Sequence, residues 1–133
     1  GYYEYLRLYD SGVEQYRTAL ALEPAAVEVY YELATLYRNV GNDSDAIATL
    51  KSLIDIQNDT EVDSKRYMRA IKLGYFQLSC CYASNGNVQE TIDVLEQAKK
   101  KDIRYPKQCF YSDNDYYGLL ENATFKEYLE ERY

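Results

Sequence analysis

Histidine is missing from this sequence, and with it the commonest general base near neutral pH and the commonest metal ligand. The chain also has no glycine-rich phosphate loop, no cluster of metal ligands and no pairing of a cysteine or serine nucleophile with a base. Paired carboxylates occur, such as Asp113 with Asp115, but they stand at an expected turn, where we interpret them as solvated. We therefore expect no enzyme activity, no cofactor and no metal site.

Positive charge is scarce as well, with 15 Lys and Arg residues against 22 Asp and Glu residues and a net charge of −7. Nucleic-acid binding needs clustered Lys and Arg, which displace counterions from phosphates. We interpret the longest basic run, Lys99 to Lys101, as the end of a helix, where the dipole favours cations. No apolar run reaches the roughly 18 residues that would span a bilayer. We therefore expect neither a nucleic-acid partner nor membrane insertion.

Cysteine is rare, and its three copies, Cys80, Cys81 and Cys109, match no zinc-binding spacing. Neighbouring residues on a helix point about 100° apart, so Cys80 and Cys81 are not expected to face one site. We interpret all three as buried or half-buried thiols in a reducing compartment, which predicts a cytoplasmic protein.

The acceptor pattern for N-glycosylation, Asn-x-Ser/Thr, begins at Asn42, Asn58 and Asn122. All three stand at expected turns, where Asn, Ser and Thr serve as helix caps. We interpret the three patterns as caps. In a secreted protein they would instead be real acceptor sites, and the thiols would need another explanation.

What the chain does contain is a pair of apolar stripes separated by a turn, between Val27 and Thr60. Both stripes step by three or four residues, which indicates helices. Gly41 is a typical helix end, and the polar residues from Asn42 onward typically open a helix. The first stripe consists of Tyr30, Leu33, Ala34 and Tyr37, and the second of Ala46, Leu50 and Leu53.

The same order returns 45 residues later, and part of it also occurs 34 residues earlier. The later copy consists of Tyr75, Leu78, Ser79 and Tyr82, then the turn residue Gly86, then Thr91, Leu95 and Ala98. The earlier, partial copy consists of Gly12, Tyr16 and Ala19 and ends at Pro24, opposite Asn58. Internal repetition of this kind predicts stacked helix pairs.

The order Tyr30-x-x-Leu33-Ala34-x-x-Tyr37, with Gly41 and Ala46 following, resembles the tetratricopeptide repeat, a family with a period of 34 residues. The resemblance implies an all-α fold, a superhelix of antiparallel helix pairs that holds other proteins. It divides the chain into a partial repeat at about 1–26, a full repeat at 27–60, an extended repeat at 61–104 and a C-terminal capping segment at 105–133. A period of 45 also suits HEAT-type repeats, but the 34-residue offset and the glycine turns argue against them.

Two departures from the family pattern have structural consequences. The third repeat is 11 residues too long, which is close to three helical turns, so we expect one long helix from about Val62 to Ser84. In the first repeat only Tyr2 to Leu8 precede the expected turn. From this we expect the chain to be cut from a longer protein.

After Arg104 the pattern changes, and Tyr105-Pro106 is expected to break the helix. Turn residues from Ser112 to Asp115, a short apolar stretch at Leu119 and a last helical face at Phe125 and beyond follow. This order resembles the tail that closes many bacterial proteins of the same repeat family. The resemblance implies a segment that covers the apolar face of the last repeat.

The resemblance places a peptide-binding groove on the first helix of each pair. The candidate groove residues are Glu28, Tyr31, Thr35, Arg38, Asn39, Leu73, Phe76 and Cys80. Some members of the family clamp the carboxylate of chaperone tails with Lys, Arg and Asn on this face. Here Tyr31, Thr35, Phe76 and Cys80 stand at those positions, so we expect no such clamp. The aromatic and apolar character of the face predicts binding of a hydrophobic peptide or helix.

Two alternatives to this groove stay open. Tyr31 and Phe76 would pack on neighbouring repeats if they belong to the core. The chain would instead be a self-association module, forming a homo-oligomer, if its N-terminal edge at Tyr2, Tyr3 and Leu6 stacks on a second copy.

Overall fold

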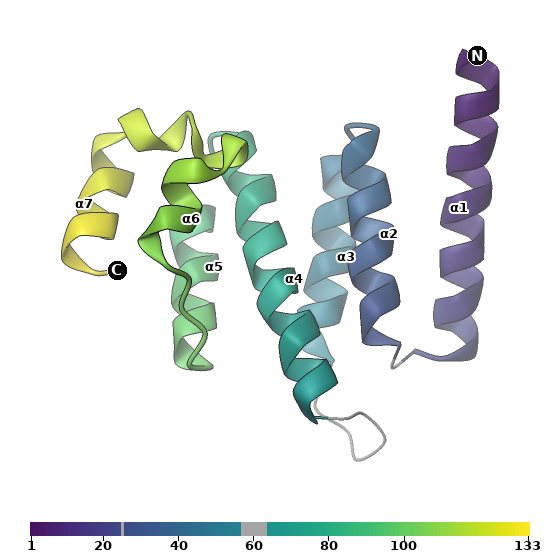
Figure 1. The fold of residues 1–133 in the computed structure, drawn as a ribbon, viewed down its shortest axis with the longest axis horizontal. Coiled ribbons are helices and arrows are strands. Elements are labelled where there is room, and N and C mark those ends of the chain that lie inside the picture. The colour runs from purple at the N-terminus through teal and green to yellow at the C-terminus, as the bar shows by residue number, and fades with distance from the viewer. Residues whose placement is uncertain (25, 57–63) are drawn as a thin grey trace. The chain divides into compact units, whose positions relative to one another are not determined.

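The computed structural model describes residues 1–24, 26–56 and 64–133, which form helices, turns and connecting segments but no strand (Figure 1). The predicted all-α fold of adjacent helix pairs is confirmed. The helices are α1 (Tyr2–Leu22), α2 (Val27–Asn39), α3 (Asp43–Asp55), α4 (Ser64–Ser84), α5 (Val88–Lys100), α6 (Lys107–Ser112) and α7 (Ala123–Glu131). Two short 3₁₀ helices, η1 (Asn114–Tyr116) and η2 (Leu119–Glu121), lie between α6 and α7.

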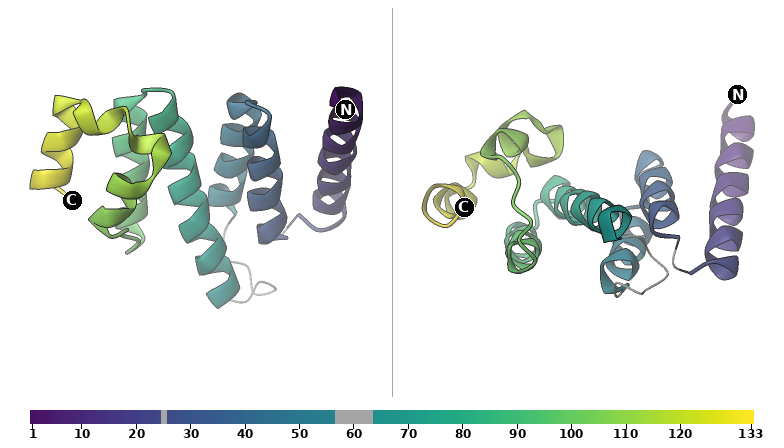
Figure 2. Two further views of the ribbon diagram at one scale, coloured as in Figure 1. Left: turned by 45° about the horizontal axis from the view of Figure 1, so that its top comes forward. Right: turned by 60° about the horizontal axis from the view of Figure 1, so that its bottom comes forward.

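The chain forms two compact units, residues 1–74 and residues 75–133, and the boundary falls within α4. In the first unit α2 packs antiparallel on α3, and α1 packs on the other side of α2 (Figures 1 and 2). Six residues of the two predicted stripes are buried in the α2–α3 pair: Leu33, Ala34, Tyr37, Ala46, Leu50 and Leu53. The seventh, Tyr30, is only half-buried, and Val27 of α2, which is outside the stripes, is buried as well. The sequence periodicity therefore identified most of this core.

A left-handed glycine joins α2 to α3. Gly41 has a φ of 79°, which a glycine adopts without the steric cost that a Cβ brings. The Asn42 N–H donates to the Tyr37 carbonyl at 2.9 Å, and the Gly41 N–H donates to the Arg38 carbonyl at 3.0 Å. These two bonds satisfy two of the carbonyls in the last turn of α2, and the Asn42 side chain caps α3 by accepting from the Asp45 N–H.

The expected turn after Leu8 is wrong, because α1 runs unbroken from Tyr2 to Leu22. By the 34-residue offset, Arg7 and Leu8 stand where Gly41 and Asn42 would stand in a full repeat. Arg and Leu are good helix formers, and neither adopts a left-handed φ without steric cost. These two positions therefore give no signal that would end the helix.

The predicted long helix is confirmed from Ser64 to Ser84, while Val62 lies outside the described residues. Its end repeats the α2–α3 turn. Gly86 has a φ of 75°, the Asn87 N–H donates to the Tyr82 carbonyl at 2.9 Å, and the Gly86 N–H donates to the Ala83 carbonyl at 3.0 Å. Two turns 45 residues apart therefore share one hydrogen-bond pattern. The division of the chain into repeats at the predicted boundaries stays a prediction.

In the second unit, the residues after Tyr105 pack on the C-terminal part of α4 and on α5. Phe110 lies at the centre, fully buried, and its ring contacts an aromatic cluster. The members of this cluster in contact with Phe110 are Phe76, Tyr116, Phe125 and Tyr133, with ring centroids 5.0–6.4 Å away. The C-terminal segment is thus part of the core of this unit.

Candidate functional site

The six predicted groove residues of the first unit lie on two helices. Glu28, Tyr31, Thr35, Arg38 and Asn39 are on α2, and Leu73 is on α4. The structure brings three of them together around a hollow of about 200 Å³, which also takes in residues that the sequence analysis missed. The full lining is Glu28, Tyr31, Glu32, Arg69, Ala70 and Leu73.

A second, wider hollow of about 530 Å³ lies on the other side of α2, against α1. Three predicted groove residues line it, and Tyr31 and Glu32 line both hollows. Its lining is Leu8, Gly12, Gln15 and Tyr16 from α1, and Tyr31, Glu32, Thr35, Leu36 and Asn39 from α2. The α1 residues were missed because the sequence analysis expected a turn after Leu8.

We call Glu28, Tyr31, Glu32 and Thr35 the α2 face. Their spacing of three or four residues places them on one side of a helix. The ring of Tyr31 is half-buried, and the Thr35 hydroxyl is engaged because it donates to the Tyr31 carbonyl at 3.0 Å. Burial and the neighbouring Glu32 carboxylate together raise the pKa of Tyr16. The α2 face therefore combines a large aromatic side chain with carboxylates.

Phe76 and Cys80, the two predicted groove residues of the second unit, lie against the C-terminal segment. The Phe76 ring lies 5.0 Å from that of Tyr105 and 6.0 Å from that of Tyr116, centroid to centroid. Cys80 is only 1% exposed. Phe76 is half-buried, and the residues that pack on it belong to the C-terminal segment, which covers this face of α4.

A buried hydrogen-bond chain fixes the C-terminal segment to α4. The Tyr116 hydroxyl donates to the Ser79 hydroxyl oxygen, which in turn donates to the Phe76 carbonyl at 2.6 Å. Burial is the main reason that the pKa of Tyr116 is raised. Ser79 takes the position of the small residue Ala34 in the earlier pair. Its hydroxyl accepts the Tyr116 hydrogen bond, which an alanine side chain could not do.

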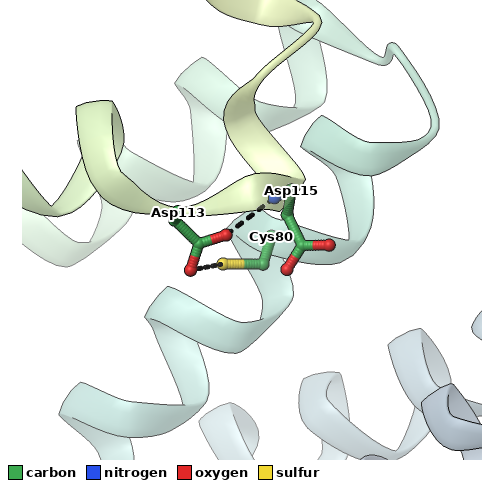
Figure 3. A group of neighbouring side chains, drawn as sticks. All are labelled: Cys80, Asp113 and Asp115. Carbon is green, nitrogen blue, oxygen red and sulfur yellow. Dashed lines mark hydrogen bonds between the residues drawn. The ribbon is translucent and has the colours of Figure 1, made fainter.

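Cys80, Asp113 and Asp115 form a group whose ligand-type atoms all lie within 4.8 Å of one another (Figure 3). The Asp113 carboxylate accepts from the Asp115 N–H at 2.8 Å and caps η1, and its other oxygen is 3.9 Å from the Cys80 sulfur. These contacts explain the arrangement as a helix cap with a thiol beside it. The two aspartates are half-buried, in contrast to the solvated positions that we expected.

Successive antiparallel helix pairs joined by glycine turns are typical of helical-repeat proteins. Comparison with known families agrees, since residues 8–67 match the family described as Tetratricopeptide repeat. That segment is therefore a tetratricopeptide-repeat segment, and it contains most of α1, the α2–α3 pair and the α2 face. The comparisons with curated proteins and with solved structures gave no match.

Tetratricopeptide repeats generally mediate protein–protein interaction and are typically not catalytic. The resemblance of residues 105–133 to the closing segment of bacterial members lies outside the matched range and stays a prediction. Every helix in the described residues is too short or too polar to cross a membrane.

Proposed function

We propose that this chain is a protein-interaction module whose α2 face holds a short segment of a partner protein. The proposal rests on a comparison of the α2 face with the corresponding face of α4. By the 45-residue offset, Tyr31 and Thr35 correspond to Phe76 and Cys80. The face of α4 that bears Phe76 and Cys80 is covered by an aromatic segment of short helices, residues 105–116. The α2 face has equivalent positions and a half-buried aromatic ring, and it opens into two hollows.

The size of the hollow between α2 and α4 supports a peptide as the occupant. At about 200 Å³ it is smaller than the roughly 300–1,000 Å³ typical of small-molecule pockets. It suits one large side chain of a longer segment. Leu73, which is 47% exposed, provides apolar surface at its edge. A partner helix or turn would place one aromatic or aliphatic side chain there, in a helix-in-groove mode.

The charges of the α2 face indicate the rest of the partner. Glu32 stands where the covered face has Gln77, and Glu28 stands where the later repeat has the exposed Leu73, so the α2 face has two carboxylates that the later repeat lacks. Glu32 is exposed and belongs to the lining of both hollows. The whole chain carries a net charge of −7, which favours cationic partners. We expect a segment that carries Lys or Arg beside its large apolar side chain.

Selection from a displayed library of random short peptides tests the proposal. We expect the enriched peptides to combine an aromatic or large aliphatic residue with Lys or Arg. Tyr31→Ala should weaken their binding about tenfold or more, and Glu32→Lys should weaken the cationic ones selectively. Tyr111→Ala removes a tyrosine that is 54% exposed on α6 and should leave binding unchanged. Peptides that bind the Tyr31→Ala variant as well as the wild type would contradict the proposed site.

A further inference from the structure

Helix α1 carries two apolar stripes. One packs on α2, and the other is largely exposed, although Gly12 and Ala19 within it are half-buried and Gly12 lies against Leu36 of α2. Leu6, Tyr9, Val13, Tyr16 and Leu20 are half-buried on the side toward α2. The second stripe, which we call the α1 seam, steps alternately by three and four residues, the spacing of a coiled-coil contact. The α1 seam consists of Tyr5, Leu8, Gly12, Gln15, Ala19 and Leu22.

The α1 seam leaves large apolar side chains in solvent. Leu8 is 74% exposed, Leu22 is 83% exposed and Tyr5 is 49% exposed. None of the α1 side chains that the structure describes is buried. By the 34-residue offset, Gly12 and Ala19 correspond to Ala46 and Leu53, which are completely buried, whereas Gly12 and Ala19 are only half-buried. Aligned apolar exposure of this kind marks an interaction surface.

The α1 seam is complementary to itself when two copies run antiparallel. With the midpoint between positions 13 and 14, Tyr5 meets Leu22 of a second copy, Leu8 meets Ala19, and Gly12 meets Gln15. In the interior of the seam each larger side chain therefore faces a small one, which lets the two helices approach closely. In a parallel pair each position would face the same position of the second copy. Leu8 would meet Leu8, Gln15 would meet Gln15, and two glycines at position 12 would leave a gap.

Charge does not oppose the antiparallel arrangement. The positions that flank the seam on its outer side and would meet across it are Ser11 and Thr18, both uncharged. The amide of Gln15 already donates to the Ser11 hydroxyl at 3.4 Å, so it retains a partner at the edge of the contact. Like charges across a helix pair would be destabilising, and the middle of the seam has none.

The hollow between α1 and α2 lies beside the seam and shares Leu8, Gly12 and Gln15 with it. Its opposite wall is the α2 side, which includes Leu36. A second helix laid along the seam would fill this space, and a two-fold axis would fill both copies of the hollow at once. We propose that α1 pairs antiparallel with α1 of a second copy of this chain along the α1 seam, forming an isologous dimer.

This proposal does not rest on the peptide site, although the two surfaces meet at Tyr31 and Glu32. Sedimentation velocity over a range of concentrations tests it. We expect the wild type to shift from a 15.6 kDa monomer to a species of twice that mass. Leu8→Glu should weaken the dimer about tenfold or more, because it places a charge in the apolar contact.

Tyr3→Glu is the matched control. Tyr3 is 82% exposed, but its helical position is on the side of α1 away from the seam. The same charge change there should leave the dimer intact, and unchanged far-UV circular dichroism would show that both variants fold. A wild type that stays monomeric at its highest soluble concentration would overturn the proposal and leave the seam to a helix of another protein. Equal dimers in the wild type and the Leu8→Glu variant would overturn it too.

Cysteine cross-linking tests the direction of the pair, in a Cys109→Ser background that removes a half-buried thiol. A mixture of the Tyr5→Cys and Leu22→Cys variants should form a disulfide-linked dimer. Tyr5→Cys alone should not, since the two positions would be about 25 Å apart in an antiparallel pair. A cross-linked dimer of the Tyr5→Cys variant alone would show parallel pairing and overturn the proposal.

Discussion

The α2–α3 pair and the pair formed by α4 and α5 have the same turn and corresponding apolar stripes, yet the corresponding faces of α2 and α4 have different surroundings. Gly41 and Gly86 end their helices with the same two hydrogen bonds and nearly the same φ. Tyr31 borders two hollows, whereas its counterpart Phe76 lies in an aromatic cluster. The helix pair alone therefore does not determine whether such a face stays open or is covered. The segment that packs beside the helix pair determines it.

Side-chain chemistry explains why the two faces differ. Thr35 in the first pair corresponds to Cys80 in the second, and Glu32 corresponds to Gln77. Burying Glu32 under an aromatic segment would leave a carboxylate out of water at a high free-energy cost, whereas a thiol is readily buried. The later face could therefore become part of the core, and the α2 face keeps its carboxylates in solvent.

The largest expected effect comes from uncovering the later face. Phe110→Ala removes a fully buried ring at the centre of the aromatic cluster, and it should lower the free energy of unfolding by about 3–5 kcal/mol. Urea denaturation followed by circular dichroism measures this. The neighbour Tyr111 is 54% exposed, so Tyr111→Ala should change stability by about 0.5 kcal/mol or less.

A second readout of the Phe110→Ala variant distinguishes uncovering from general unfolding. Cys80 is 1% exposed beneath the C-terminal segment. In the variant its thiol should react faster with a water-soluble thiol reagent under native conditions, while the helical signal persists. Unchanged protection of Cys80 would contradict the view that the C-terminal segment is what covers this face.

The sequence predicted the features that local chemistry determines. Gly41, Gly86 and the long unbroken stripe of α4 each specify a backbone state by themselves, and all three agree with the structure. The contacts that cover Phe76 and bury Cys80 come from residues distant in the sequence, including Asp113 and Tyr116, and helical spacing carries no signal for those contacts. The turn predicted after Leu8 was an error of another kind, since its offset lacked the glycine that such a turn requires.

The shared turn predicts equal losses at two places. Gly41→Ala and Gly86→Ala should each destabilise the protein by about 1–2 kcal/mol, because both residues have a positive φ that is strained for alanine. The open space around each Cβ position does not remove this backbone strain. Thermal unfolding of the two variants measures the comparison. Gly118, with a φ of −68° and no neighbour near its Cβ position, is the matched control, and Gly118→Ala should be neutral or slightly stabilising. A loss at only one of the two turns would show that they are not equivalent.

The smallest expected effect concerns the contact between α5 and the last helix, at Glu96, where α3 has the exposed Lys51 instead. One Glu96 carboxylate oxygen accepts from the Lys99 ammonium at 2.9 Å and from the Tyr128 hydroxyl at 2.7 Å. The hydrogen bond from Lys99, then that from Tyr128, lowers the pKa of Glu96. Because its folded-state pKa lies below the unfolded value, this carboxylate stabilises the protein above its ordinary pKa. That contribution is lost as the pH falls through the folded-state value.

Glu96→Gln should therefore lower the free energy of unfolding at neutral pH, and the difference from the wild type should vanish in acid. The Glu96 side chain is 43% exposed, so solvent screens the interaction and about 0.5 kcal/mol is expected. Chemical denaturation at a series of pH values from neutral to acid measures the difference. Glu130→Gln, at an exposed position on α7, serves as the control for removing one negative charge. A difference that persists unchanged in acid would mean that the Glu96 charge does not hold α7 to α5, and that the amide's shape or lost packing is responsible.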